Sequence, residues 1–214
     1  MAKHSELELP ETVPIPGGPG GRTLFRLGLT PVTNAQYARF LAGSPDIPPP
    51  PWWSDPDFSA PRQPVVGVTW DEAAAYCRWL SRIAGGTWRL PAEAEWELAM
   101  SGGLAAPRTP WGEEIPAGEV PEGSLAGPWE TGRGRPNPYG LLDPGTMVHE
   151  WCLDWREPER GPGTEAAVPP VRRRASRGGS WRHRIRWSSP SARSSLPPSY
   201  RYSDYGFRGL LEVP

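Results

Sequence analysis

The residue types that could act as nucleophiles or bind transition metals are scarce in this sequence. Its 214 residues include two cysteines, Cys77 and Cys152, and three histidines, His4, His149 and His183. Two cysteines are too few for the disulfide framework of a small secreted domain, so we expect both to be buried as small apolar side chains. The histidines do not follow the spacing of a metal-binding motif. We therefore expect no ligand cluster, no bound metal and no cofactor.

Arginine dominates the end of the chain. Residues 171–214 carry ten arginines against two acidic side chains, a net charge of +8. Residues 1–170 carry 13 basic and 22 acidic side chains, a net charge of −9. One interpretation is an internally compensated fold, in which the basic segment lies against an acidic body. The other is a basic recognition surface for an acidic protein, a phosphate-rich ligand or nucleic acid.

The composition indicates a globular fold with short regular elements and long ordered loops. The 30 prolines and 25 glycines interrupt helices and strands, while 12 tryptophans carry too much apolar surface for a chain that stays solvated. These numbers exclude an all-helical bundle. Lys3 is the only lysine and side-chain amides are rare, which is typical of a thermophile but also of GC-rich codon usage.

Hydrophobic periodicity and capping residues predict three helices that must position the rest. We expect helices over residues 34–41, 70–83 and 91–100, with Thr33 and Thr69 as the N-caps of the first two. The loops between elements are longer than in most compact domains, which indicates either function or a fold built on irregular structure. Extended segments are expected at residues 24–29, 65–68, 87–90, 147–155, 176–181 and 206–213.

Several long motifs follow one another along residues 20–214. They are residues 31–40 (PVTNAQYARF), 64–80 (PVVGVTWDEAAAYCRWL), 89–97 (RLPAEAEWE), 137–143 (NPYGLLD) with 150–151 (EW), 177–181 (RGGSW) and 206–208 (GFR). Together they resemble the formylglycine-generating enzyme (sulfatase-modifying factor) family. The resemblance implies an α+β, C-type-lectin-like fold with two main helices, small antiparallel sheets and much ordered loop. We expect a flexible N-terminal tail over residues 1–21 and a single domain over residues 22–214.

The sequence departs from that family where its chemistry takes place. The family's enzymes activate oxygen at a copper ion held by two cysteines just after a Gly-Gly-Ser-aromatic motif. Here Gly178-Gly179-Ser180-Trp181 is followed by residues 182–193, which contain no cysteine. Because monovalent copper needs soft thiolate ligands, we expect no enzyme activity of this kind. The family also binds structural calcium; Met147 supplies no side-chain oxygen there, whereas Asp143 and Glu150 could.

Residues 182–205 differ in composition from the family motifs on either side. They resemble the variable region of a protein diversified by a diversity-generating retroelement. Such elements rewrite adenines, so that Asn codons yield Arg, His, Ser, Tyr, Asp, Ile or Leu, but never Glu, Gln, Lys or Met. None of the last four occurs between Arg177 and Arg208. An ordinary divergent loop on a family domain is the alternative. The candidate ligand-binding residues are Arg182, His183, Arg184, Ile185, Arg186, Ser188, Ser194, Ser195, Ser199, Tyr200, Tyr202, Ser203, Asp204 and Tyr205.

These features predict a non-enzymatic protein that binds a ligand through a diversified C-terminal surface. Serine, tyrosine and arginine suit such a surface, as they do in antibodies, while Arg193 and Arg201 are expected to hold the loops through carboxylate or carbonyl contacts. We expect a protein ligand, with an acidic one favoured, and a monomer. The alternatives are a formylglycine-generating oxidase and a nucleic-acid binder, although no nucleic-acid-binding motif is present. With no signal peptide and no apolar run of about 18 residues, we expect no membrane insertion and a cytoplasmic location.

Overall fold

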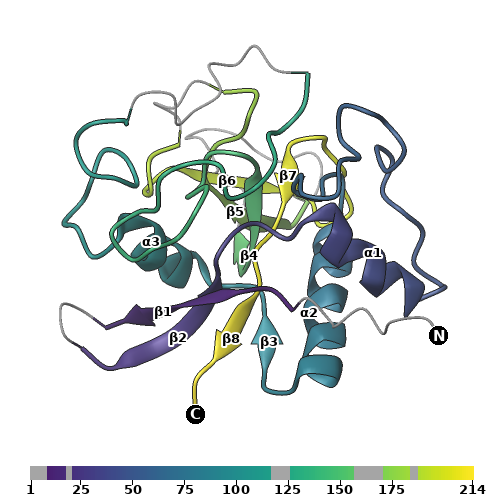
Figure 1. The fold of residues 1–214 in the computed structure, drawn as a ribbon, viewed down its shortest axis with the longest axis horizontal. Helices are drawn as coiled ribbons and strands as arrows, with labels where there is room; N and C mark the ends of the chain where they lie inside the picture. The colour runs from purple at the N-terminus through teal and green to yellow at the C-terminus, as the bar shows by residue number, and fades with distance from the viewer. Residues whose placement is uncertain (1–8, 18–20, 117–125, 157–170, 184–187) are drawn as a thin grey trace, which may run out of the picture.

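The computed structural model describes residues 9–17, 21–116, 126–156, 171–183 and 188–214. Within these ranges, three helices and two four-stranded sheets are joined by long loops, in the α+β arrangement that was expected (Figure 1). The elements are β1 (Thr12–Pro16), β2 (Thr23–Gly28), α1 (Asn34–Ala42), α2 (Trp70–Ala84), β3 (Trp88–Arg89), α3 (Glu93–Ser101), β4 (His149–Arg156), β5 (Arg173–Arg177), β6 (Arg193–Leu196), β7 (Tyr205–Gly206) and β8 (Leu210–Glu212).

Capping boxes fix the starts of the first two helices. The side chains of Thr33 and Thr69 accept hydrogen bonds from backbone N–H groups in the first turns of α1 and α2, as the sequence predicts. Helix α3 starts at Glu93, two residues later than expected, because the Pro91 carbonyl accepts a hydrogen bond from Leu153 of β4 at 2.8 Å. In the part of the chain that the structure describes, no helix combines the length and apolar character needed to cross a membrane.

The first sheet brings the beginning and the end of the domain together. Its strand order is β1-β2-β8-β3, with antiparallel neighbours throughout. Strand β1 lies at an edge, and its Ile15 is fully buried against Phe25 and Leu27 of β2. Residues 12–16 are therefore a strand of the domain that contributes Ile15 to the core, and the expectation of a flexible tail over residues 1–21 is wrong for this stretch. The sequence did not predict this strand because the segment is rich in proline, although one side chain of the strand, Ile15, faces the core.

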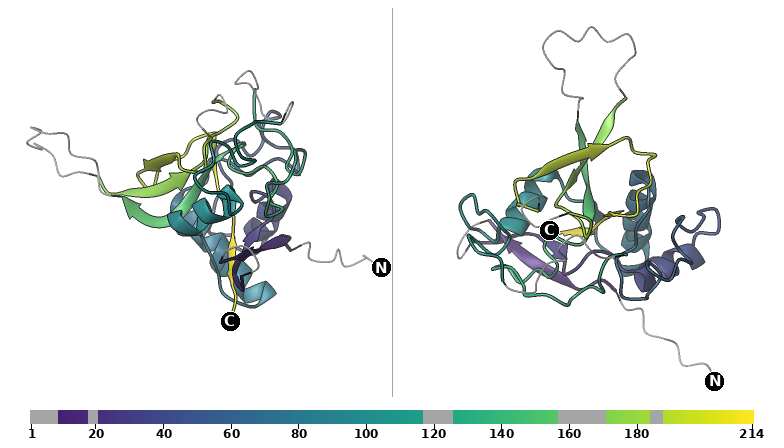
Figure 2. Two further views of the ribbon diagram at one scale, coloured as in Figure 1. Left: turned by 90° about the vertical axis from the view of Figure 1, so that its left-hand side faces the viewer. Right: turned by 90° about the horizontal axis from the view of Figure 1, so that it is seen from above.

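The second sheet carries the residues of greatest functional interest. Its order is β6-β5-β4-β7, with β7 parallel to β4 so that His149 lies opposite Tyr205. Strands β4 and β5 project from the body of the molecule in both views of Figure 2. The strand expected over residues 176–181 instead ends at Arg177, because Gly178 has a φ of +79° and turns the chain.

Two further predicted strands differ from the observed elements. Residues 65–68 are buried but form no strand, and only Pro64 before them forms an isolated bridge, with Thr33. The strand expected over residues 206–213 is split into β7 and β8, and the fully buried Arg208 lies between them. Strand β6 was not expected at all.

The two cysteines lie in different apolar clusters. Cys77 of α2 packs in a cluster with Tyr76 and Leu80, which also includes residues of α1. Cys152 of β4 packs in the other cluster, with Trp96 of α3. Both thiols are free and buried, as the sequence predicts. They are therefore parts of two different cores.

Arginines from the basic end of the chain pair with glutamates of the acidic body. Arg208 and Glu150 form a fully buried ion pair, with Nε 2.9 Å from Oε1. Arg177, also fully buried, pairs with Glu97 of α3. Arg201 forms a third pair, described with the site below. The interpretation of an internally compensated fold is thus correct for these arginines.

Candidate functional site

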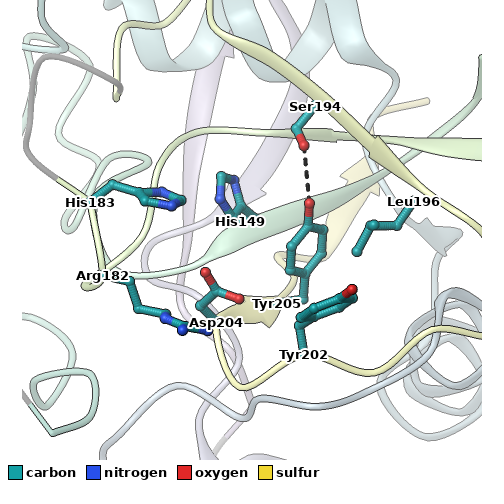
Figure 3. Close-up of a pocket in the computed structure, with 8 residues that line it drawn as sticks. All are labelled: His149, Arg182, His183, Ser194, Leu196, Tyr202, Asp204 and Tyr205. Atoms are coloured by element: carbon teal, nitrogen blue, oxygen red, sulfur yellow. Dashed lines mark hydrogen bonds between the residues drawn. The ribbon is translucent and has the colours of Figure 1, made fainter.

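A cavity of about 520 Å³ opens beside the second sheet. Residues from β4, β6, β7 and the loops next to them form its walls, and Figure 3 shows their side chains facing one space. Six of the predicted contact residues line it, together with two that sequence reasoning missed, His149 and Leu196. The lining residues are His149, Arg182, His183, Ser194, Leu196, Tyr202, Asp204 and Tyr205.

His149 is the first residue of β4 and is held rigidly. Its Nδ1 lies 2.8 Å from the carbonyl oxygen of Gly178, and since a carbonyl can only accept, Nδ1 carries the proton. Gly178 reaches this position because the chain passes very close to Gly145; a Cβ on Gly178 would lie 3.0 Å from the Gly145 backbone. Burial lowers the pKa of His149, although the Asp204 carboxylate acts in the opposite direction. The buried imidazole is therefore neutral near pH 7 and presents Nε2 as its lone-pair nitrogen.

His183 and Asp204 complete a polar group around His149. The rings of His149 and His183 lie edge to face, with centroids 5.2 Å apart. The Ser180 hydroxyl donates to Oδ2 of Asp204 at 2.9 Å and lies 3.4 Å from Nδ1 of His183. One ligand atom from each of the two histidines and the aspartate lies within 4.8 Å of the others. The expectation that the histidines do not cluster is thus wrong for this pair; His4 lies outside the described residues.

Tyrosines lie beside His149 and extend to the rim of the cavity, with the ring centroids of Tyr205 and His149 4.8 Å apart. Tyr205 is buried, and its hydroxyl lies 3.0 Å from Oγ of Ser194 (Figure 3). Tyr202 stacks obliquely on Tyr205 at 6.0 Å, and Tyr200 lies 6.4 Å beyond it. Tyr200 is 49% exposed and Tyr202 is 42% exposed. The row thus runs from the core out to solvent, and its outer rings are available for contact.

The remaining predicted residues differ in how accessible they are. Ser199 is exposed, whereas Ser195 and Ser203 are half-buried and engaged: Ser195 accepts from Arg173, and the Ser203 carbonyl accepts from a tryptophan. Ser188 is 2% exposed and packs over the backbone of Gly179, so it cannot present a side chain to a partner. Arg184, Ile185 and Arg186 lie outside the described residues.

Arg201 anchors the loop that carries the exposed tyrosines. Its guanidinium donates two hydrogen bonds to the carboxylate of Glu72, at 2.5 and 2.8 Å, and one to the Gly67 carbonyl at 2.8 Å. This is the scaffold role that the sequence predicts. Arg193 is more exposed, and its Nη2 lies 3.9 Å from a carboxylate oxygen of Glu97. The bidentate ion pair between Arg201 and Glu72 therefore holds the loop that bears Tyr200.

The two cysteines are not suited to bind copper or to react. Burial raises the pKa of Cys77 to about 12. Burial also raises the pKa of Cys152, and the nearby Glu150 carboxylate adds to that shift. Both groups are therefore thiols near neutral pH, whereas thiolates are the metal ligands and nucleophiles. The residues present do not fit the copper site of the family's enzymes.

The candidate calcium ligands are also occupied by the protein itself. Glu150 accepts two bonds from Arg208, and its Oε2 accepts a third from Trp96 at 2.7 Å. Oδ2 of Asp143 accepts from the backbone N–H of Gly132 at 2.7 Å. A hard cation would have to compete with a buried guanidinium for the Glu150 carboxylate. These residues do not fit the calcium site that the family implies.

The fold and the sequence define the family of the chain. The model of the Sulfatase-modifying factor enzyme 1-like domain matches residues 2–213. The chain belongs to this family, as the motifs in its sequence indicate.

The relatives are longer proteins, and this chain matches only a part of each. The formylglycine-generating enzyme of Streptomyces coelicolor is 35% identical over 181 residues, which cover 69% of this chain and 52% of that protein. The serine/threonine-protein kinase pkn1 of Chlamydia pneumoniae is 39% identical over 157 residues, which cover 69% of this chain and 24% of that protein. The chain thus spans about half of the first relative and about a quarter of the second.

Solved structures with the same fold cover nearly the whole chain. PvdO from Pseudomonas aeruginosa has a TM-score of 0.70 at 22% identity and covers 95% of this chain and 91% of its own. Treponema denticola variable protein 1 has a TM-score of 0.70 at 22% identity, with 96% and 92% coverage. At this identity the likeness establishes the fold alone, which is the formylglycine-generating-enzyme type of C-type-lectin-like fold.

Proposed function

We propose that this chain is a non-enzymatic ligand-binding protein whose contact residues lie in the diversified segment 182–205. One observation carries the proposal: six residues predicted from sequence as contacts gather around a single cavity. They come from two loops and two strands within the single segment 182–205. A row of tyrosines leads from this cavity to solvent, which supplies contact area at low entropic cost.

The division of labour within the segment supports this role. Arg201 is tied to Glu72 and Gly67, so it holds the loop. Tyr200 and Tyr202, on either side of it, are exposed. Alternation of anchoring and exposed residues would let substitutions change the contacts without unfolding the domain. The name of a structural neighbour, Treponema denticola variable protein 1, agrees with such a use of this fold.

The many arginines of residues 171–214 predict a strongly basic site. In the structure the site is less basic, so its charge restricts the class of ligand less. Arg177, Arg201 and Arg208 are neutralised by glutamates of the body. Among the described residues, Arg182 is the only arginine that lines the cavity, and Asp204 lines it too. A protein ligand fits the aromatic rim, and the preference for an acidic one rests on Arg182.

The oxidase alternative is tested by direct assay. The full chain, loaded with monovalent copper, is incubated with a cysteine-containing peptide of a sulfatase under oxygen, and the peptide is analysed by mass spectrometry. We expect no oxidised product, because Cys77 and Cys152 are protonated, buried and in separate cores. Formation of the aldehyde in the peptide would refute the non-enzymatic role.

The diversification itself is tested in the DNA that surrounds the gene. We expect a near-copy of the DNA encoding residues 178–208 beside a reverse-transcriptase gene, with differences confined to adenines of the copy. Absence of any such repeat from the complete genome would leave an undiversified family domain.

Binding to nucleic acid is separated from protein binding by its dependence on salt. A phosphate-driven complex loses affinity steeply between about 50 and 200 mM salt. Arg177, Arg201 and Arg208 form ion pairs within the protein. Because their charges are already neutralised, we expect no such complex with single- or double-stranded oligonucleotides. Tight, salt-sensitive binding would favour the nucleic-acid alternative.

A further inference from the structure

Three candidate metal ligands converge at one wall of the cavity. His149, His183 and Asp204 each place a ligand atom within 4.8 Å of the other two (Figure 3). Two imidazoles and one carboxylate are a ligand set typical of divalent transition metals, whereas calcium prefers oxygen alone. We propose that this cluster binds a divalent transition-metal ion such as Zn²⁺.

The hydrogen bonds around the cluster orient it for coordination. Nδ1 of His149 donates to the Gly178 carbonyl, so that Nε2 is the nitrogen left to bind an ion. Ligating histidines in metalloproteins are held in this way by an outer acceptor on the other nitrogen. Ser180 acts similarly on Asp204, since its hydroxyl donates to Oδ2 at 2.9 Å. Two of the three ligands are therefore oriented before any ion arrives.

The backbone fixes the same two ligands relative to each other. The N–H of His149 donates to the Asp204 carbonyl at 2.8 Å, and the parallel pairing of β4 with β7 begins at the next residue, Tyr205. Both side chains are buried, whereas His183 is half-buried on the turn after Trp181. Bonds of about 2.0–2.2 Å to a shared ion would draw the three donor atoms closer together. His183, the most exposed member, is the one free to move inward.

The surroundings of the cluster determine which further ligands the ion would bind. Three protein ligands leave at least one coordination position, and the cavity of about 520 Å³ lies beside it. Water or an oxygen from a ligand would fill that position. The charge of Arg182 opposes a cation, but this side chain is exposed and can extend into solvent. The metal site does not depend on the proposed ligand-binding role and would also exist in an undiversified domain.

Metal titration of the full chain, purified without a polyhistidine tag, tests the site. Binding of Zn²⁺ is measured by competition with a chromophoric chelator, and binding of Co²⁺ by its visible d–d absorption. We expect one ion per chain, with no thiolate charge-transfer band because both cysteines are buried elsewhere. His183→Ala and Asp204→Asn should each weaken Zn²⁺ binding at least tenfold.

Ser194→Ala provides the matched control, because Ser194 lines the same cavity but is not one of the three ligands. Its Zn²⁺ affinity should stay within twofold of the parent. Thermal unfolding in chelator shows whether each variant is folded, and Asp204→Asn preserves side-chain size if His183→Ala fails that check. Failure of the parent to bind Zn²⁺, or binding that survives loss of both ligands, would overturn the proposal. Neither result bears on the peptide-oxidation or genomic tests above.

Discussion

At the residue scale, Glu150 belongs to a family motif, and its role in this chain is to stabilise the fold. Both its oxygens accept hydrogen bonds from Arg208, and one also accepts from Trp96. Arg208 in turn donates to the carbonyls of Leu142 and Asp143. The pair therefore ties β4 to Arg208, 58 residues further along the chain, and to the loop that precedes β4. A buried pair of this kind contributes less by its existence than it costs when one partner is removed.

Glu150→Gln should lower the free energy of unfolding by about 3–5 kcal/mol, because it leaves the Arg208 guanidinium buried without its counter-charge. Urea unfolding followed by tryptophan fluorescence measures the change. Glu212→Gln is the control: Glu212 pairs with Arg89 but is 46% exposed, so its loss should cost no more than about 1 kcal/mol. Equal effects of the two substitutions would contradict the structural role of Glu150.

The cysteines give a second prediction at this scale. In the native protein, neither Cys77 nor Cys152 should react with a disulfide reagent such as DTNB at pH 8. A pKa of about 12 leaves Cys77 protonated there, since thiolate forms only as the pH approaches the pKa. Both should react at once in urea. Rapid release of thionitrobenzoate from the folded chain would show that one thiol is accessible and ionised.

At the element scale, strand β1 shows why a proline-rich segment should not be dismissed as a tail. Its register with β2 places Val13 opposite Leu27 and Ile15 opposite Phe25. Proline is tolerated because β1 is an edge strand. Ile15 faces the core, whereas Leu24 on β2 is 47% exposed.

Ile15→Ala should therefore destabilise the domain by about 2–5 kcal/mol, through lost burial and a cavity in the cluster around Trp96. Leu24→Ala removes an aliphatic side chain from the same sheet, yet should change stability by no more than about 0.5 kcal/mol. Thermal and urea unfolding of both variants makes the comparison. A neutral Ile15→Ala would instead favour the flexible tail that the sequence predicts over residues 1–21.

At the scale of the whole molecule, the small net charge of −1 results from an acidic body and a basic C-terminal segment that meet in ion pairs. Arg177 shows this connection. It pairs with Glu97 of α3 and donates to the carbonyls of Ser191 and Ala192, just before β6. A helix of the body, β5 and the approach to β6 are thus held by one buried side chain.

Arg177→Met and Arg182→Met remove the same charge from the same segment, but their effects should differ. Arg177→Met should lower stability by at least about 2 kcal/mol, because Glu97 and the carbonyls of Ser191 and Ala192 lose the donor that a fully buried side chain supplies. Arg182→Met should stay within about 0.5 kcal/mol, because Arg182 is exposed. Differential scanning calorimetry resolves the two cases. Similar melting temperatures would mean that net charge, rather than internal pairing, sets the stability.

Local signals made part of this structure predictable. Thr33 and Thr69 marked helix starts because a capping box is complete within four residues. Burial of the cysteines followed from their small apolar character. Strand β6 was missed because three of its four residues, Arg193–Leu196, are polar and because it pairs with β5, a partner that no local sequence signal indicates. Ser188 was assigned to the surface by composition, and packing against Gly179 buries it.

The sequence by itself determined the family, the scaffold and the loss of the cysteine pair, because these depend on residue types and on motifs that are short and contiguous. Only the tertiary structure decided what lies beside what. His149 directly precedes the motif at residues 150–151 and Asp204 lies in the segment 182–205, and no local pattern links them. They meet because β7 pairs in parallel with β4, and because the close passage of Gly178 over Gly145 aims one imidazole at the cavity. Contacts between distant segments are set by the packing of the whole fold, and the candidate site is made of such contacts.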